Sequence, residues 1–511
     1  MSHLLSIIVA APALASALLV ALPKESRLAI RLVSLLGASV SLVGAIAVAL
    51  LWDRSAGGFQ LREFYPLVPS LGINIIFAVD GWGVALLLLT GLIIFAGVLA
   101  SWSVSRRDAE FFFFLLLLVS GVFGVFVSQD LFVFFLFYEI AVLPMYLLIG
   151  IWGASHEVPR QGPFQCVWSR FSVGSKEYAA MKLTLMLLVG SAAILVAMLA
   201  LWKEAGGTFD LQKLEQTRFS PITQHWVFPV IWLGFGTLAG VFPFHTWSPD
   251  GHASAPTAVS MLHAGVLMKL GAFGVMRIGM VLLPSGAAEW VNWVGAVAVI
   301  NILYGALCAA RQTDLKYIVA YSSVSHMGVV MLGAATLNIN GWNGAVYQMV
   351  AHGIMTGLFF ALVGLVYERA HTRALAKMGG FAHLMPAVAA FFTLACLSSL
   401  GLPGTAGFVA EFLVFLGAAQ DTISWWWTIP SVVGAFVTAV YVLRACKQIF
   451  WGPAPEAECA HLSDARGTER AAPILLGAAL VVFGFWPRLL LDDIDVTTTA
   501  HLHQAAQLAE R

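Results

Sequence analysis

Apolar runs of about 20 residues recur along the whole of this 511-residue chain. A run of that length crosses the hydrocarbon core of a bilayer as one α-helix. Charged residues make up only 11% of the chain, compared with about 25% in soluble globular proteins. The runs are continuous and do not alternate with polar residues, which excludes a membrane β-barrel. The sequence therefore predicts an all-α, multi-pass membrane protein.

Fourteen of these runs are predicted to span the membrane. Their approximate ranges are 3–22, 29–52, 79–101, 111–128, 130–152, 177–202, 225–246, 254–283, 287–310, 315–335, 342–368, 385–418, 425–451 and 470–491. The longest polar connections fall at 53–78, 153–176, 203–224 and 452–469, and none is long enough for a soluble domain.

Lysine and arginine are distributed unevenly among the predicted loops. Odd-numbered loops hold eighteen of them and even-numbered loops hold six, one of which is Arg277. Because positively charged loops stay in the cytoplasm, we expect both termini on the opposite, periplasmic side of a bacterial inner membrane. No positive charge precedes the first apolar run, so we expect a retained helix there and no cleaved signal peptide.

The sequence contains no motif for a disulfide framework, a metal site or a nucleotide site. The five cysteines are scattered and form no CxxC pair, so we expect neither disulfides nor a zinc or iron–sulfur site. No glycine-rich nucleotide loop occurs. The net charge is zero, which gives no reason to expect a nucleic-acid partner, and the bilayer is the expected surroundings.

Titratable residues inside the predicted spans are the strongest functional signal. They are Glu139, His263, Lys269, His326, His352 and Glu411. A charged group at the centre of a bilayer costs about 3 kcal/mol on insertion scales, so such residues usually face the bundle interior. Acidic, basic and imidazole groups with water between them can pass protons. Structural ion pairs or helix–helix hydrogen bonds are the alternative, most of all for the histidines.

Two proline-containing stretches interrupt the predicted helices near these residues. The first is "FPFHTWSPDGHASAPTAV", with Pro243, Pro249 and Pro256, and the second is "GLPGTAGF", with Pro403 and Gly404. Proline removes a backbone donor, and irregular backbone at membrane depth survives only in protein or beside a wet cavity. Interrupted helices in corresponding places of two halves are typical of transporters with a site near the midplane.

Long motifs in a fixed order carry a family resemblance. They include "DLFVFFLFYEIAVLPMYLLIGIWG", "FPFHTWSPDGHASAPTAVSMLHAGVLMKLG", "DLKYIVAYSSVSHMG", "VYQMVAHG", "ERAHTRALAKMGG" and "GLPGTAGFVAEF". They resemble the antiporter-like, proton-translocating subunits of respiratory complex I, most closely the M type. The resemblance implies two inverted five-helix repeats with broken seventh and twelfth helices. It divides the chain into helices 1–3 (1–110), two halves (111–283 and 287–451), and a loop, last helix and tail (452–511).

The resemblance also implies roles for individual residues. Glu139 corresponds to the glutamate of the input half-channel, Lys269 to the lysine that links the halves, and Glu411 to the output residue. His326 and His352 correspond to polar groups of the central axis. His245 and Asp250 correspond to structural residues after the break. This chain would bind no NADH and no metal; FMN, iron–sulfur clusters and quinone would belong to other subunits of the complex, and other antiporter-like subunits would flank it.

Two features depart from the family pattern. The family has a lysine seven positions before His245, where this chain has Leu238, and the segment 153–176 resembles an insertion. Without that lysine, Glu139 would lose its cation. We expect His263 to take over part of the lost role, because on a helix it points about 120° away from Lys269.

The sequence thus predicts a proton-translocating membrane subunit of a complex I-like NADH–quinone oxidoreductase. Two alternatives remain open at this point. One is a subunit of a multisubunit cation/proton antiporter or a membrane-bound hydrogenase, and the other is a membrane scaffold that does not pump.

Overall fold

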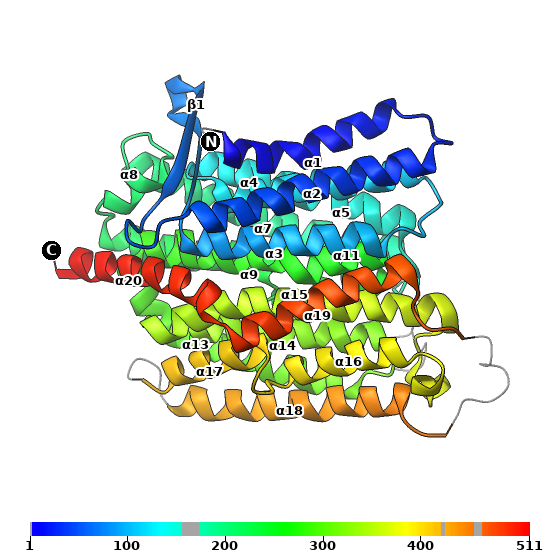
Figure 1. Cartoon of the computed structure of the whole chain (residues 1–511). Helices are drawn as coiled ribbons and strands as arrows, with labels where there is room; N and C mark the ends of the chain where they lie inside the picture. Colours follow the sequence, from blue (N-terminus) through cyan, green and yellow to red (C-terminus); the bar gives the residue numbers. More distant parts are fainter. Residues whose placement is uncertain (1–2, 156–172, 421–424, 454–461, 511) are drawn as a thin grey trace.

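A computed structural model describes residues 3–155, 173–420, 425–453 and 462–510. The helices lie side by side in one bundle, in which α1 begins and α20 ends near the β1–β2 hairpin (Figure 1). We call this end of the bundle the hairpin end. The opposite end, which carries the connections 22–26, 101–107 and 371–385, is called the basic end.

The first half of the chain contains one β-hairpin and a series of helices. They are α1 (Leu4–Ala21), α2 (Arg27–Leu51), β1 (Gln60–Val68), β2 (Ile73–Val79), α3 (Gly81–Ala100), α4 (Asp108–Val127), α5 (Leu131–Trp152), α7 (Lys176–Glu204), α8 (Leu211–Gln216), α9 (Pro221–Ala239), α10 (Trp247–Ser254), α11 (Thr257–Leu262), η3 (His263–Leu267), α12 (Met268–Gly274) and η4 (Val275–Met280). A short 3₁₀ turn, η2 (Phe244–Thr246), connects α9 to α10.

The second half is almost entirely helical. Its main elements are α13 (Pro284–Arg311), α14 (Leu315–Ala335), α15 (Ile339–Ala370), α16 (Pro386–Ser399), α17 (Ala406–Ala418), α18 (Trp425–Phe450), η8 (Gly467–Arg470), α19 (Ala471–Phe485) and α20 (Arg488–Glu510).

The described part of the chain contains thirteen helical spans that are long and apolar enough to cross a bilayer. The helices α16 and α17, of 14 and 13 residues, follow one another and are too short individually. Counted as one interrupted span, they complete the fourteen that the sequence predicts.

Both predicted interruptions are present. After α9, Gly240 takes a φ of +74°, and the chain passes Pro243 before α10 begins. After α16, Gly401 and Gly404 take φ values of +72° and +94° before α17 begins. Glycine adopts this left-handed conformation without the steric cost that a Cβ imposes. The breaks therefore follow from the glycines and prolines of the two motifs.

The eighth span is wholly buried and is not a uniform α-helix. Two π-helical segments, η3 and η4, lie on either side of α12, which carries Lys269. π-Helical turns are rare and often occur at functional sites, because their wider turns change the carbonyls that side chains can reach. The centre of the bundle thus contains irregular helix next to its buried lysine.

Three elements lie where the sequence predicted only loops or a tail. The β1–β2 hairpin occupies the connection 53–78 and adds a small antiparallel sheet to the predicted all-α fold. The short helix α8 lies in 203–224, and α20 continues the chain after α19 as a 23-residue helix. Most of the insertion-like segment 153–176 lies outside the described residues.

One assignment from the sequence is wrong. Arg277 was placed in an even-numbered loop, but it lies in η4 with 1% of its surface exposed. A lone arginine near the end of an apolar run resembles a loop residue. Here Asp80, just before α3, supplies its counterion inside the protein.

Candidate functional site

Lys269 lies at the centre of the bundle and is completely buried. Its ammonium donates a hydrogen bond to Nδ1 of His352 on α15, at 2.7 Å, and another to the carbonyl oxygen of Ala264. Ala264 belongs to the π-helical turn η3, five residues before the lysine. An acceptor nitrogen requires the neutral form of His352, so this contact pairs a proton donor with a proton acceptor.

His326 on α14 continues from His352 toward the twelfth span. The two imidazole rings are nearly parallel, with centroids 5.2 Å apart. Nδ1 of His326 lies 2.7 Å from the carbonyl oxygen of Ser322, and Nε2 lies 3.2 Å from that of Ser399. Two carbonyl acceptors suit a doubly protonated ring, since a neutral imidazole can donate from only one nitrogen.

Glu411 on α17 lies at the end of this series. Its Oε1 is 3.6 Å from Nε2 of His326. The break between α16 and α17 surrounds the pair, because Ser399 ends α16 and a Cβ on Gly401 would lie 2.8 Å from Oε2 of Glu411. The interrupted helix thus brings a carbonyl oxygen and a carboxylate to the same imidazole.

Four of the six residues predicted from the sequence therefore form one connected series. We call Lys269, His352, His326 and Glu411 the axial line. Its members come from the eighth, eleventh, tenth and twelfth spans, which are far apart in sequence and adjacent in the bundle. A hydrogen bond joins Lys269 to His352, ring stacking joins His352 to His326, and a 3.6 Å contact joins His326 to Glu411, so each side chain that can hold a proton lies next to another.

Glu139 on α5 lies outside the axial line. It is half-buried, with the side chain of Ser191 beside it. Its Oε1 is buried without a hydrogen-bond partner, and no ion pair joins it among the residues that the structure describes. Leu238, at the position where the family has lysine, is fully buried and offers no charge.

His263 lies in a second group of buried rings, together with a histidine that the sequence analysis did not single out. That histidine is His252 on α10, whose ring centroid lies 3.9 Å from that of His263. Trp247 stacks on His263 at 5.1 Å, and Phe360 of α15 stacks on His252 at 5.4 Å. The only sequence signal for His252 is its place in the proline-rich stretch, eleven residues before His263.

The hairpin end contains a buried ionic cluster that the sequence analysis also missed. Arg277 pairs with Asp80 and contacts Nε2 of His501 on α20 at 2.7 Å. Burial alone would raise the pKa of Asp80, but Arg277 and His501 hold it below its usual range. Burial raises the pKa of Glu215 on α8, and the nearby His501 and Arg277 offset only part of that effect.

The basic end of α10 is held by ionic contacts. Lys182 of α7 pairs with Asp250 at 2.7 Å, and the Tyr317 hydroxyl of α14 donates to the same carboxylate at 2.9 Å. Lys316 donates to the carbonyl oxygen of Ala255 at 2.6 Å. Positive charge at the C-terminal end of a helix is favourable because the backbone carbonyls there carry partial negative charge.

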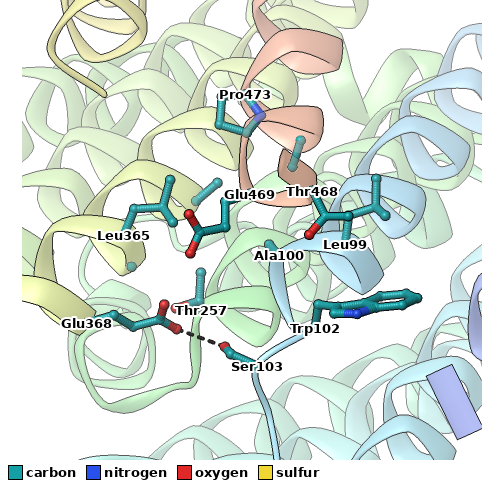
Figure 2. Close-up of a pocket in the computed structure, with 13 residues that line it drawn as sticks. Leu99, Ala100, Trp102, Ser103, Thr257, Leu365, Glu368, Thr468, Glu469 and Pro473 are labelled. Carbon is teal, nitrogen blue, oxygen red and sulfur yellow. Dashed lines mark hydrogen bonds between the residues drawn. The ribbon is translucent and has the colours of Figure 1, made fainter. Parts of the chain in front are cut away.

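A cavity of about 50 Å³ lies among the ends of α3, α11, α15 and α19 at the basic end. Figure 2 shows Ser103, Thr257, Glu368 and Glu469 around it, with the Ser103 hydroxyl donating to Glu368. Its walls also include Ala361, which follows Phe360 in α15. The volume is sufficient for one or two water molecules.

The described residues contain no group of three or more histidines, cysteines and carboxylates that could hold a metal ion.

Comparison with known proteins identifies the family. The family model described as NADH:quinone oxidoreductase/Mrp antiporter, TM, matches residues 128–438. NAD(P)H-quinone oxidoreductase chain 4 3 of Picosynechococcus sp. is 35% identical over 99% of this chain and 96% of its own length. NAD(P)H-quinone oxidoreductase chain 4 1 of Synechococcus sp. is 38% identical over 89% of this chain and 84% of its own length.

Solved structures share the fold. A chain of respiratory complex I from Thermus thermophilus with bound NADH aligns with a TM-score of 0.86 and 29% identity, covering 98% of this chain and 99% of that one. A chain of the Mrp complex from Dietzia sp. has a TM-score of 0.83 at 21% identity, covering 99% and 98%, and shows a common fold. The protein is therefore an integral, multi-pass membrane protein that belongs to the NADH:quinone oxidoreductase/Mrp antiporter transmembrane family.

Proposed function

We propose that this chain is the proton-translocating subunit 4, or M, of an NAD(P)H–quinone oxidoreductase. Redox chemistry in other subunits, which would hold FMN, iron–sulfur clusters and quinone, would drive proton movement through this one. Two findings support the assignment: near full-length similarity to curated chain 4 proteins, and the fold shared with a complex I chain. Other membrane subunits would be its partners, with antiporter-like subunits on either side.

The axial line is the observation that carries the proposal. Lys269 can give a proton to Nδ1 of His352, which leaves a neutral amine and an imidazolium. The imidazolium can release its other proton from Nε2, which has no partner among the described residues. His326 can receive this proton once its Nε2 has released one toward Glu411, whose Oε1 lies 3.6 Å away. Each step conserves charge between neighbouring groups and needs no redox centre in this chain.

The ends of the route are assigned from chemistry and family position. Glu411 would release protons, and Glu139 would belong to the input half, with His263 as a switchable cation that compensates for Leu238. The hairpin end would face the periplasm, because the excess of basic residues lies in the connections of the other end. The membrane would be the bacterial inner membrane, and the two halves 111–283 and 287–451 would act as the antiporter-like repeats.

Substitution of Lys269 tests this function directly. In sealed vesicles from the native host, the assembled complex with Lys269→Ala is expected to pump fewer protons per electron pair than wild type. Lys447→Ala, which removes an exposed lysine in the last turn of α18, is the matched control and should pump normally. Wild-type pumping in an assembled Lys269→Ala complex would contradict the proposal and favour a scaffold.

Partner identification separates the proposal from its main rival. Copurification of peripheral flavin and iron–sulfur subunits supports the oxidoreductase. A complex of membrane antiporter subunits alone, with sodium-dependent proton exchange and no quinone reduction, would favour a cation/proton antiporter.

A further inference from the structure

Cys396 on α16 and Cys446 on α18 are two buried cysteines that the proton route does not use. They are 1% and 4% exposed, and both are free thiols in this structure. Helices α16 and α18 lie side by side in the bundle (Figure 1). They run in opposite directions, because α16 begins at the basic end and α18 ends there. Two cysteines that are far apart in the sequence therefore meet where these helices pack together.

Three contacts place the two thiols next to each other. Sγ of Cys446 lies 3.6 Å from the hydroxyl oxygen of Thr393, which is one turn before Cys396 in α16. The Cys396 thiol donates to the carbonyl oxygen of Val442, one turn before Cys446 in α18, at 3.7 Å. The two thiols also interact directly with each other. A disulfide between two helices requires side chains that already face one another in this way.

The two thiols differ in their distance from the surface of the protein. Cys446 lies four residues before the end of α18 at Phe450, and its thiol interacts with Trp451, which is 59% exposed. Cys396 lies deeper in the bundle, where it lines a cavity of about 10 Å³ together with Ser322. A cavity of this size has room for about one water molecule. A small oxidant that arrives from the basic end therefore meets Cys446 first, and Cys396 is placed to react second.

Cys396 is also close to the proposed outlet of the axial line. It lies three residues before Ser399, the last residue of α16. The carbonyl oxygen of Ser399 is 3.2 Å from Nε2 of His326, and Oε1 of Glu411 is 3.6 Å from the same nitrogen. A covalent bond at Cys396 would hold the end of α16 to α18 within one helical turn of that carbonyl. It would thereby restrict any movement of the α16–α17 break.

We propose that Cys396 and Cys446 form a redox-active dithiol that a hydroperoxide oxidises to a disulfide between α16 and α18, and that this bond restricts proton release at Glu411. The second part rests on the proposed function. The first part concerns a modification site and is independent of it.

Two steps form the disulfide. In the first, the Cys446 sulfur bonds to one oxygen of hydrogen peroxide, the O–O bond breaks, and the other oxygen leaves as water with the thiol proton. In the second, the Cys396 sulfur attacks the resulting sulfenic acid. The S–S bond forms, the S–O bond breaks, and the hydroxyl group leaves as water with the Cys396 proton. The two thiols lose two electrons, which reduce one hydrogen peroxide to two water molecules.

The first test detects this bond in the assembled complex. Native membrane vesicles are treated with hydrogen peroxide, the remaining thiols are alkylated, and the chain is digested with trypsin, which cuts after Arg444 and Lys447. Mass spectrometry is expected to find the tripeptide 445–447 attached to the peptide 378–444. Dithiothreitol should release it.

Single cysteine variants are the controls. Cys396→Ser and Cys446→Ser should each lose the linkage. Cys308→Ser is the matched control, because it removes the free thiol of α13, which also packs against α18, and it should keep the linkage. Free thiols at both positions after treatment with hydrogen peroxide and with diamide, a second thiol oxidant, would overturn the proposal.

The second test measures protons pumped per electron pair before and after the oxidation. The ratio is expected to fall in wild type and in Cys308→Ser, and dithiothreitol should restore it. It should not change in Cys396→Ser. An equal loss in Cys396→Ser, or a disulfide that leaves the wild-type ratio unchanged, would overturn the effect on proton release. Normal pumping by Lys269→Ala would instead overturn the proposed function, and the disulfide would still be detected.

Discussion

At the scale of single residues, this protein keeps a small number of buried polar groups in direct contact. An ammonium, two imidazoles and a carboxylate are costly in an apolar interior unless each finds a partner. Lys269 donates a hydrogen bond to His352. His326 lies within hydrogen-bond distance of two carbonyl oxygens and 3.6 Å from Glu411. The contacts reduce the cost of burial and at the same time connect the groups in the order that proton transfer requires.

Among the described residues, His352 is the side chain of the axial line that Lys269 contacts directly. His352→Phe keeps the ring volume and removes both nitrogens, so we expect assembly to persist while protons pumped per electron pair fall below the wild-type value. Tyr347→Phe on the same helix is the control, because it removes a buried hydrogen bond, to the carbonyl oxygen of Phe483, away from the line. Normal pumping by the assembled His352→Phe complex would show that protons bypass this residue.

At the scale of elements, the interrupted helices matter because they free backbone carbonyl oxygens. In a continuous α-helix these oxygens accept hydrogen bonds from the backbone of the same helix. The break after α16 leaves the carbonyl oxygen of Ser399 facing His326 and brings Glu411 of α17 toward the same ring. The π-helical turn η3 similarly presents the carbonyl oxygen of Ala264 to Lys269. Irregular backbone is placed where the protein needs acceptors.

Two glycines of the α16–α17 break provide a matched test. Both have positive φ, so alanine at either costs about 1–2 kcal/mol in backbone strain. A Cβ on Gly401 would also meet Oε2 of Glu411 at 2.8 Å, whereas a Cβ on Gly404 would meet the Phe485 ring at 3.3 Å. We expect Gly401→Ala to reduce the pumping ratio more than Gly404→Ala at similar thermal stability. Equal pumping by the two variants would argue against an outlet at Glu411.

At the scale of the whole molecule, buried ionic contacts at the hairpin end connect distant parts of the chain. Asp80 precedes α3, Arg277 ends the eighth span and His501 comes from α20, so one cluster ties the first, middle and last parts of the chain together. Gln504 of α20 also donates to the backbone of Glu215 in α8. This end of the bundle depends on pairing that no local sequence pattern reveals.

Removal of Arg277 would leave Asp80 buried without its counterion. Arg277→Met is expected to destabilise the protein by about 3–5 kcal/mol, and Asp80→Asn in the same chain should restore part of the loss. The midpoint of thermal unfolding of the purified complex measures both. A double variant that is no more stable than Arg277→Met would contradict the pairing.

The depressed pKa of Asp80 sets a pH dependence with a definite sign. A carboxyl whose folded pKa is lowered stabilises the protein above its unfolded pKa, about 3.9, and loses that contribution as the pH falls through the folded value. The stability advantage of wild type over Asp80→Asn should therefore be constant near neutral pH and shrink only below about pH 4. Shrinkage already between pH 8 and pH 6 would mean that another group is titrating.

Topology gives the last prediction at this scale. An accessible cysteine tag added after residue 511 should react with membrane-impermeant reagent from the periplasmic side of intact cells, because basic residues favour the opposite end as cytoplasmic. A tag in the connection 371–385 should react only in inverted vesicles. Labelling of the C-terminal tag from the cytoplasm alone would overturn the orientation.

The sequence alone determined the membrane class and the two breaks, and thirteen of its fourteen predicted spans match segments that are long and apolar enough to cross a bilayer. Hydrophobic run length and proline and glycine chemistry are local properties, so they can be read without knowing the neighbours. It also identified Lys269, His326, His352 and Glu411 as candidates, since a titratable residue in an apolar run is conspicuous wherever it points.

Only the tertiary structure decided which of these residues meet. It brought four into one line, left Glu139 apart, and paired His263 with His252, which sequence reasoning had passed over. It moved Arg277 from a predicted loop into a buried cluster with Asp80 and His501. The physical reason is that each of these contacts joins different helices. Which side of a buried helix faces a given neighbour depends on how the helices pack. An almost uniformly apolar span has no polar face that would reveal this side in its own sequence.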